Sequence, residues 1–218
     1  MIRCFRPTVR NCYIWHLLLP ANTDIIRLDL YANPNDTMAE LKFFTERLKL
    51  RLVEMADLEA VHVLHLMAET DQYNTLGIPK DLEETNLIVD GWINDHQKRT
   101  IKNYTFAIEL EKGGFIGLIA LKLSSSKFNS AEVWYKINVE HWNKGYATEA
   151  IKAVLNFSFS KLKLHRINAG CAVENQASIR VLEKAGMTQE GRIRQLLPLV
   201  TGWMDSFHYA ILDEEWKA

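Results

Sequence analysis

The segment from Val139 to Thr148, VEHWNKGYAT, combines residue types that could hold a phosphate group. A strand pattern ends near its start and an amphipathic helical pattern follows, which predicts a strand-to-helix junction. The first N–H groups of a helix lack intrahelical partners and carry partial positive charge, so they favour an anion. Gly145 would let the backbone approach such a ligand, and Ala147 is small enough not to block it. An ordinary helix start is the alternative interpretation.

A second junction lies further along the chain, where a strand pattern ends at Val173 and a short helical pattern ends at Gly186. Asn175 and Ser178 stand at the spacing of a helix N-cap and its third residue, and a cap worth about 1 kcal/mol would explain them. Both side chains are also expected at the mouth where the two strands end side by side. They are therefore candidates for contacting a ligand held at the first junction.

Positive charge gathers around the two junctions. Residues 141–186 hold seven Lys or Arg and three Glu, a net charge of +4, whereas the whole chain carries −1. Such a surface suits a ligand with several phosphate groups, and a solvated basic face is the alternative interpretation. Arg180 and Lys184 lie one helical turn apart and are the expected phosphate contacts.

The two junctions require a sheet whose strands end at a common edge. Apolar patterns predict strands over residues 48–52, 104–110, 115–123, 131–139, 165–173, 191–199 and 203–212. Helical spacing predicts helices after Asp57, from Asp81, over 146–161 and over 175–185. The order β-α-α-β-β-β-α-β-α-β-β predicts an α+β protein, an α/β three-layer arrangement in which helices flank a mixed central β-sheet.

Composition limits the classes of function. A chain of 218 residues with 48% hydrophobic and 24% charged residues can bury a core without disulfides or metals. The near-zero net charge argues against direct nucleic-acid binding. No apolar run reaches the roughly 20 residues of a membrane span, so no membrane partner is expected. His62 and His65 have no third ligand at a recognisable spacing, so no metal site is expected either.

Cysteine usage indicates a reducing compartment. Cys4, Cys12 and Cys171 cannot all pair internally, and none belongs to a CxxC motif, so the cytoplasm is the expected location. The first 23 residues are basic and then apolar, which loosely imitates a signal peptide. The apolar run is short and interrupted by His16, and secretion is retained only as an alternative.

The residues at the two junctions resemble the GNAT superfamily of acetyl-CoA-dependent N-acetyltransferases. The resemblance lies in EHWNKGYATEAIKAVL and HRINAGCAVENQASIRVLEKAGM and in the separation between them. The chain is most similar to the Rim-type branch, which includes enzymes that acetylate the N-termini of ribosomal proteins. Thr45–Leu48 resembles the opening of that branch, and Met204–Asp205 with Tyr209 resembles its closing strand. The resemblance covers about residues 44–216 and implies the GNAT fold, with an N-acetyltransferase domain at 44–218.

The resemblance implies acetyl-CoA as cosubstrate. Trp142 stands at the Gln/Arg position of the family pattern Gln/Arg-x-x-Gly-x-Gly/Ala, as is usual in the Rim-type branch. The family holds the pyrophosphate on backbone amides of this loop and pairs the pantetheine arm with the preceding strand end. Met187 departs from the Phe that the family prefers, which is a packing change. The residues assigned in this way to acetyl-CoA, together with the two basic residues above, are Ile137, Asn138, Val139, Trp142, Asn143, Lys144, Gly145, Tyr146, Ala147, Thr148, Asn175, Arg180 and Lys184.

Direct attack of an amine on the thioester is expected rather than a covalent enzyme intermediate, because Cys171, the candidate nucleophile, lies within a strand and has no recognisable His partner. Ser178 is expected to hydrogen-bond or protonate the departing thiolate, and a backbone N–H near Val139 to meet the oxyanion. Glu132 stands where the superfamily often carries a strand glutamate and is the candidate general base. Tyr135 and Glu109 are the alternatives for the base, and a surface carboxylate is the alternative role of Glu132.

The acceptor implied by the Rim-type branch is a protein N-terminal α-amine. At pH 7 an α-amine costs roughly 1.1 kcal/mol to deprotonate and a lysine roughly 4.6 kcal/mol, so a weak base suffices only for the former. The alternatives are a small-molecule amine acceptor and a non-catalytic acyl-CoA-binding module. The sequence leaves the oligomeric state open, with a homodimer among the possibilities.

Residues 1–43 have no counterpart in the Rim-type pattern and are assigned to an N-terminal extension of unknown role. Met38 lies just before the family-like start, so a misassigned upstream start codon is one explanation for the extension. A real segment that covers one face or a partner subunit is the other explanation.

Overall fold

The computed structural model describes residues 27–29 and 41–217, and for residues 27–29 it describes the backbone only. Cys4, Cys12, Met38, the signal-like start and most of the expected extension lie outside the described residues. The elements are β1 (Arg27–Asp29), β2 (Lys42–Phe44), β3 (Leu48–Leu52), η1 (Met55–Asp57), α1 (Leu58–Leu66), α2 (Ala68–Asp71), α3 (Leu82–His96), β4 (Asn103–Leu110), β5 (Phe115–Leu123), β6 (Ser130–Ile137), η2 (Val139–His141), α4 (Tyr146–Ser160), β7 (Arg166–Ala172), α5 (Gln176–Lys184), β8 (Thr188–Leu199) and β9 (Gly202–Leu212).

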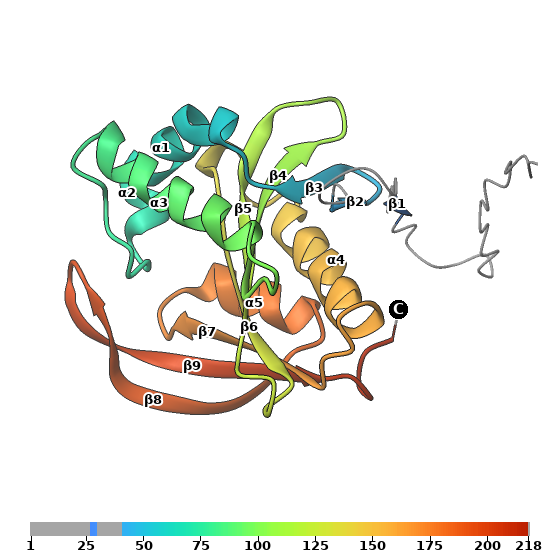
Figure 1. Cartoon of the computed structure of the whole chain (residues 1–218). Helices are drawn as coiled ribbons and strands as arrows, with labels where there is room; N and C mark the ends of the chain where they lie inside the picture. Colours follow the sequence, from blue (N-terminus) through green and yellow to red (C-terminus); the bar gives the residue numbers. More distant parts are fainter. Residues whose placement is uncertain (1–26, 30–40, 218) are drawn as a thin grey trace, which may run out of the picture.

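The described strands form one nine-stranded mixed sheet in the order β1-β2-β3-β4-β5-β6-β7-β9-β8. Within this part of the chain only β6 and β7 pair in parallel, and every other neighbouring pair is antiparallel. Figure 1 shows α1 and α3 on one side of the strands and α4 on the other. The expected three-layer α+β arrangement is therefore confirmed.

The larger core lies between the sheet and α4. Apolar residues of α4 recur at helical spacing, and Ile151, Val154 and Leu155 are completely buried against strands β3 to β7. A smaller core lies on the opposite face, where Val61 of α1 and Val89 of α3 pack against the sheet. Since both faces are covered, the central strands are apolar along most of their length.

Most expected boundaries hold to within a few residues, and three differences have physical causes. The strand expected over 131–139 ends at Ile137, because Asn138 accepts a hydrogen bond from the Glu140 amide and starts the 3₁₀ turn η2. Helix α2 and strand β2 were not expected, and with four and three residues both are too short to show a period.

Strand β2 includes a core residue on the extension side of the expected boundary at residue 44. Phe43 is completely buried, with its ring centroid 5.1 Å from that of Phe106 and 4.9 Å from that of Phe157. The backbone of β2 also pairs with β3 along residues 49–51. The sheet and its core therefore begin before the family-like region.

Phe43→Ala should lower the free energy of unfolding by about 3–5 kcal/mol, because it leaves a ring-sized cavity in the larger core. The matched control is Phe44→Ala, since Phe44 points to the other face of the same strand and is only half-buried. Denaturant unfolding followed by tryptophan fluorescence measures both. Equal, small losses in the two variants would show that β2 is not part of the cooperative core.

Candidate active site

The parallel strands β6 and β7 diverge at the centre of the sheet. Their register contains the pairs Ser130 with Arg166, Ala131 with Ile167, and Glu132 with Asn168, and it stops there. Beyond this point β6 stays paired with β5 to Ile137, while β7 pairs with β9. The edge of β6 that faces β7 therefore has no strand partner over its last five residues. Extended backbone of this kind can accept another extended chain.

A pair of hydroxyl groups spans the divergence. The Tyr135 hydroxyl of β6 donates a hydrogen bond to Ser178 Oγ of α5 over 3.0 Å. Burial raises the pKa of Tyr135 to about 12, while the bond to Ser178 acts in the opposite direction. The phenol therefore stays protonated at neutral pH and can polarise the serine hydroxyl. The sequence predicts Ser178 at this site but indicates Tyr135 only as an alternative base.

The short helix α5 is capped in the way its sequence indicates. Asn175 Oδ1 accepts a hydrogen bond from the Ser178 amide over 3.0 Å, so the capping interpretation is confirmed as geometry. The same contact fixes Ser178 at the start of the helix, facing Tyr135. Arg180 and Lys184 are exposed further along α5, and neither forms an ion pair with another described residue.

The loop between β6 and α4 holds its backbone in left-handed conformations at two positions. Asn143 has φ +58° and Gly145, the N-cap of α4, has φ +82°. No side chain caps this helix, so the first amide groups of α4, from Tyr146 to Thr148, are left without a capping acceptor. The junction therefore has the unpaired donors that the sequence predicts.

Two of the residues assigned to the cofactor are already engaged within the protein. The indole Nε1–H of Trp142 donates to the Ile137 carbonyl over 2.7 Å, which ties the loop back to the end of β6. The Asn138 amide donates to the Ile116 carbonyl of β5 over 2.9 Å. The amide of Val139, by contrast, donates to no acceptor in the described part of the chain. Of these three residues, Val139 is the one whose backbone amide is free.

An ionic cluster that the sequence analysis missed ties the start of β3 to this loop. Glu149, in the first turn of α4, accepts from Thr45 Oγ1 (2.5 Å), from the Arg47 amide (3.0 Å) and from Arg47 Nε (2.8 Å). Arg47 also donates from Nη1 to the Lys144 carbonyl over 2.9 Å. Its guanidinium carbon lies 4.7 Å from the centre of the Tyr146 ring. Thr45–Leu48 had been noted only as a family-like opening, without a role.

The two residues proposed for catalysis from the sequence do not touch. Side chains alternate along β6, so Tyr135 packs with the larger core while Trp134 and Lys136 point towards α1 and α3. Glu132 shares the parity of Trp134 and is exposed. It therefore lies on the opposite face of β6 from the pair formed by Tyr135 and Ser178.

Polar groups are also buried on the face of β6 that bears Glu132. Lys136 Nζ, His65 Nδ1 and Asp71 Oδ1 have no hydrogen-bond partner among the described residues. Burial lowers the pKa of Lys136 to about 8, and the Asp71 carboxylate acts in the opposite direction. Burial also lowers the pKa of His65 to about 4. This face thus combines an exposed carboxylate with a weakly basic, poorly solvated amine.

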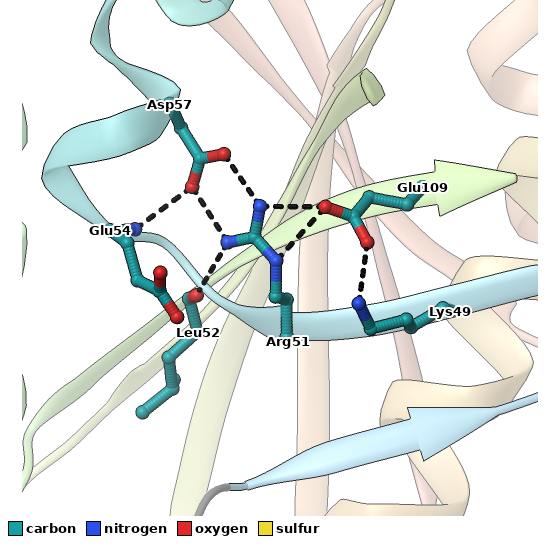
Figure 2. Close-up of polar contacts among 6 residues, drawn as sticks. All are labelled: Lys49, Arg51, Leu52, Glu54, Asp57 and Glu109. Atoms are coloured by element: carbon teal, nitrogen blue, oxygen red, sulfur yellow. Dashed lines mark hydrogen bonds and ion pairs between the residues drawn. The ribbon is translucent and has the colours of Figure 1, made fainter. Parts of the chain in front are cut away.

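Glu109, an alternative base, is held between two cations. Its carboxylate accepts hydrogen bonds from Lys49 over 2.8 Å and from Arg51 over 2.9 and 2.6 Å. Figure 2 shows these contacts. Burial alone would raise the pKa of Glu109, but these hydrogen bonds and charges lower it below its usual range. Arg51 also binds both oxygens of Asp57. Glu109 therefore holds Lys49 and Arg51 in place and is a poor proton acceptor.

The remaining sequence candidates are placed as follows. Cys171 is buried in β7, and burial raises the pKa of its thiol to about 11, so little nucleophilic thiolate forms at neutral pH. Among the residues described, no cluster of three or more potential metal ligands occurs. None of the helices described is both long and apolar enough to cross a membrane.

Comparisons with known sequences identify the family. The profile of the acetyltransferase (GNAT) domain matches residues 47–188, about two thirds of the chain. The uncharacterized N-acetyltransferase YnaD of Bacillus subtilis is 44% identical over 86 residues, which cover 39% of this chain and 51% of that relative. The putative ribosomal N-acetyltransferase YdaF of the same organism is 32% identical over 108 residues, covering 50% of this chain and 59% of YdaF.

Solved structures share the fold over most of the chain. The spermidine N-acetyltransferase of Vibrio cholerae, in complex with CoA and spermine, matches with a TM-score of 0.70 and 27% identity, covering 77% of this chain and 96% of that one. Mycobacterium smegmatis RimJ, in complex with CoA-disulfide, also matches with a TM-score of 0.70, at 25% identity and 78% and 84% coverage. The chain thus belongs to the GNAT acetyltransferase family, with relatives in its Rim-type branch, and is an N-acetyltransferase.

Proposed function

We propose that the protein transfers the acetyl group of acetyl-CoA, by direct attack, to the α-amine of a protein N-terminus. The contact between Tyr135 and Ser178 at the divergence of β6 and β7 carries this proposal. It places a polarised hydroxyl group where the unpartnered edge of β6 could hold the thioester arm. The family membership supports acetyl-CoA as the donor, and CoA is present in the two solved structures described above.

The donor is proposed to lie along β6 with its pyrophosphate at the start of α4. The unpaired amides from Tyr146 to Thr148 and the left-handed backbone at Gly145 favour an anion there. The pantetheine arm would follow the free edge of β6. The side-chain nitrogen Nδ2 of Asn175 would be available to the arm, because capping uses only Oδ1. Arg180 and Lys184 would face the phosphates.

The proposed chemistry forms a C–N bond and breaks the C–S bond of the thioester. The amine attacks the carbonyl carbon, and the amide of Val139, which has no acceptor among the described residues, would donate to the oxygen as it gains charge. Ser178, which accepts a hydrogen bond from Tyr135, can turn its own proton towards the departing sulfur. One proton leaves the amine and one reaches the thiolate, so the overall reaction is balanced. Glu132 would relay the amine proton to solvent.

A weak base favours an α-amine as the acceptor. Glu132 is exposed to water, and the Glu109 carboxylate is already bound by Arg51 and Lys49, so neither is a buried carboxylate free to take the amine proton. An α-amine needs only about 1.1 kcal/mol to lose its proton at pH 7, compared with about 4.6 kcal/mol for a lysine-like amine. A polyamine is the second candidate acceptor, because the V. cholerae relative is a spermidine N-acetyltransferase.

The cytoplasm is the proposed location. Cys171, the one cysteine within the described residues, is a buried free thiol, as suits a reducing compartment. A homodimer is retained as the proposed assembly, to be tested by light scattering.

Gly145→Ala should strongly weaken binding of acetyl-CoA. The left-handed φ of +82° is strained for any residue with a side chain, and a new Cβ would lie 3.3 Å from Arg47 Nη2, so the Arg47 guanidinium that contacts this loop would have to shift slightly. The wild-type protein should gain about 2.7 kcal/mol of stability at 100 times the dissociation constant, which thermal melting detects. The control is Gly113→Ala, which has φ +91° but open space around its Cβ position. It should keep the ligand-induced shift, and loss of the shift in both variants would contradict the proposal.

Ser178→Ala should lower kcat by roughly 10- to 1000-fold with little change in acetyl-CoA affinity, because the hydrogen bond to sulfur strengthens as charge develops. Tyr135→Phe should lower kcat less, since it only removes the polarising donor. Steady-state kinetics and calorimetric binding measure the two quantities separately. Retention of more than half the wild-type kcat by Ser178→Ala, with chemistry limiting the rate, would remove Ser178 from the catalytic residues.

The pH dependence should follow the acceptor. With a peptide acceptor, kcat/KM should rise with pH to a plateau with an apparent pKa near 8, because the α-amine must be neutral. It should show no fall from Tyr135 up to pH 10, because the pKa of Tyr135 lies at about 12 and the phenol keeps its proton there. Thiol release with N-terminal peptides and with spermidine measures this. A higher kcat/KM for spermidine would favour the polyamine acceptor instead.

A further inference from the structure

Glu149 places a negative charge in the first turn of α4, beside the loop proposed to hold the phosphates of acetyl-CoA. Its side chain is only 16% exposed, so water screens this charge poorly. An unpaired carboxylate at this position would repel a pyrophosphate. The structure supplies a specific counter-charge, because Arg47 Nη2 lies 2.6 Å from Glu149 Oε2.

Arg47 contacts both the loop between β6 and α4 and the first turn of α4. Three of its N–H groups are directed, from Nε and Nη2 to Glu149 and from Nη1 to the Lys144 carbonyl. The Lys144 carbonyl belongs to the residue before Gly145, so this contact fixes the left-handed turn from outside. The guanidinium also lies over the Tyr146 ring. A single side chain, one residue before β3, thus contacts Lys144 and Tyr146 on either side of Gly145, and Glu149 in the first turn of α4.

We propose that Arg47 is a positioning residue for the acetyl-CoA site, which fixes the turn at Lys144–Gly145 and cancels the charge of Glu149 beside the cofactor phosphates. The inference rests on the proposed function, because it requires the pyrophosphate to lie at this loop. It goes beyond that function by making a residue outside both sequence motifs a determinant of donor affinity.

The test compares two acetyl donors that differ in the phosphates. Acetyl-CoA carries the pyrophosphate, and S-acetylpantetheine carries the same thioester arm without it. For Arg47→Met, kcat/KM with acetyl-CoA should fall by about tenfold or more, mainly through KM, whereas kcat/KM with S-acetylpantetheine should change less than about twofold. Adding Glu149→Gln to Arg47→Met should recover part of the loss, because it removes the uncompensated charge.

Arg166→Met is the matched control. Arg166 is a partly exposed arginine that forms an ion pair with Glu190, but it lies at the start of β7, at the opposite end of the β6 pairing from the loop. Arg166→Met should leave the ratio of kcat/KM for acetyl-CoA to kcat/KM for S-acetylpantetheine unchanged. The melting temperature of each variant shows whether it is folded. A second variant, Arg47→Lys, keeps the charge and should retain more of the preference for acetyl-CoA than Arg47→Met.

Equal losses with both donors in Arg47→Met, no loss at all, or no recovery in the double variant would overturn the inference. Failure of the proposed function looks different. In that case the wild-type protein itself would fail to prefer acetyl-CoA over S-acetylpantetheine, whatever residue 47 is.

Discussion

The divergence of β6 from β7 is the constraint on which the rest of the candidate site depends. Two parallel strands that stop pairing after Glu132 and Asn168 leave backbone groups unsatisfied at the centre of a covered sheet. Helices α4 and α5 begin just beyond the ends of these two strands, and the hydroxyl contact between Tyr135 and Ser178 joins β6 to α5 across the divergence. The unsatisfied edge and the helix starts then face a common region.

The alternation of β6 separates the two sides of the proposed reaction. Tyr135 faces the helices that are proposed to hold the donor, while Glu132 and Trp134 face the layer formed by α1 and α3. Successive side chains of any β-strand point to opposite faces of the sheet, so this separation requires no special sequence. One consequence is that donor and acceptor groups can be substituted independently, because neighbouring residues on β6 serve different faces.

The sequence allowed the long elements and both junctions to be predicted, because their periods and helix caps are local signals. The capping contact of Asn175 with Ser178 spans three residues and was foreseen. The contact of Arg47 with Glu149 spans 102 positions, and nothing in a single sequence indicates that these two residues meet. Strand β2 was missed for a different reason, since three residues are too few to show alternation, although Phe43 lies in the core.

The network around Arg51 makes the attachment of the α1 layer sensitive to acid. Arg51 joins Asp57, at the start of that layer, to Glu109 on β4, so an ionic contact holds the layer to the sheet in addition to the smaller apolar core. The folded-state pKa of Glu109 lies below its ordinary value of 4.5, so the unfolded chain takes up its proton first as the pH falls. The contact of Glu109 with Arg51 therefore contributes its full stability above the unfolded pKa of Glu109, and loses it as the pH falls through the lower folded pKa. On acidification the layer of α1 and α3 therefore loses part of its attachment to the sheet, while its apolar contacts remain.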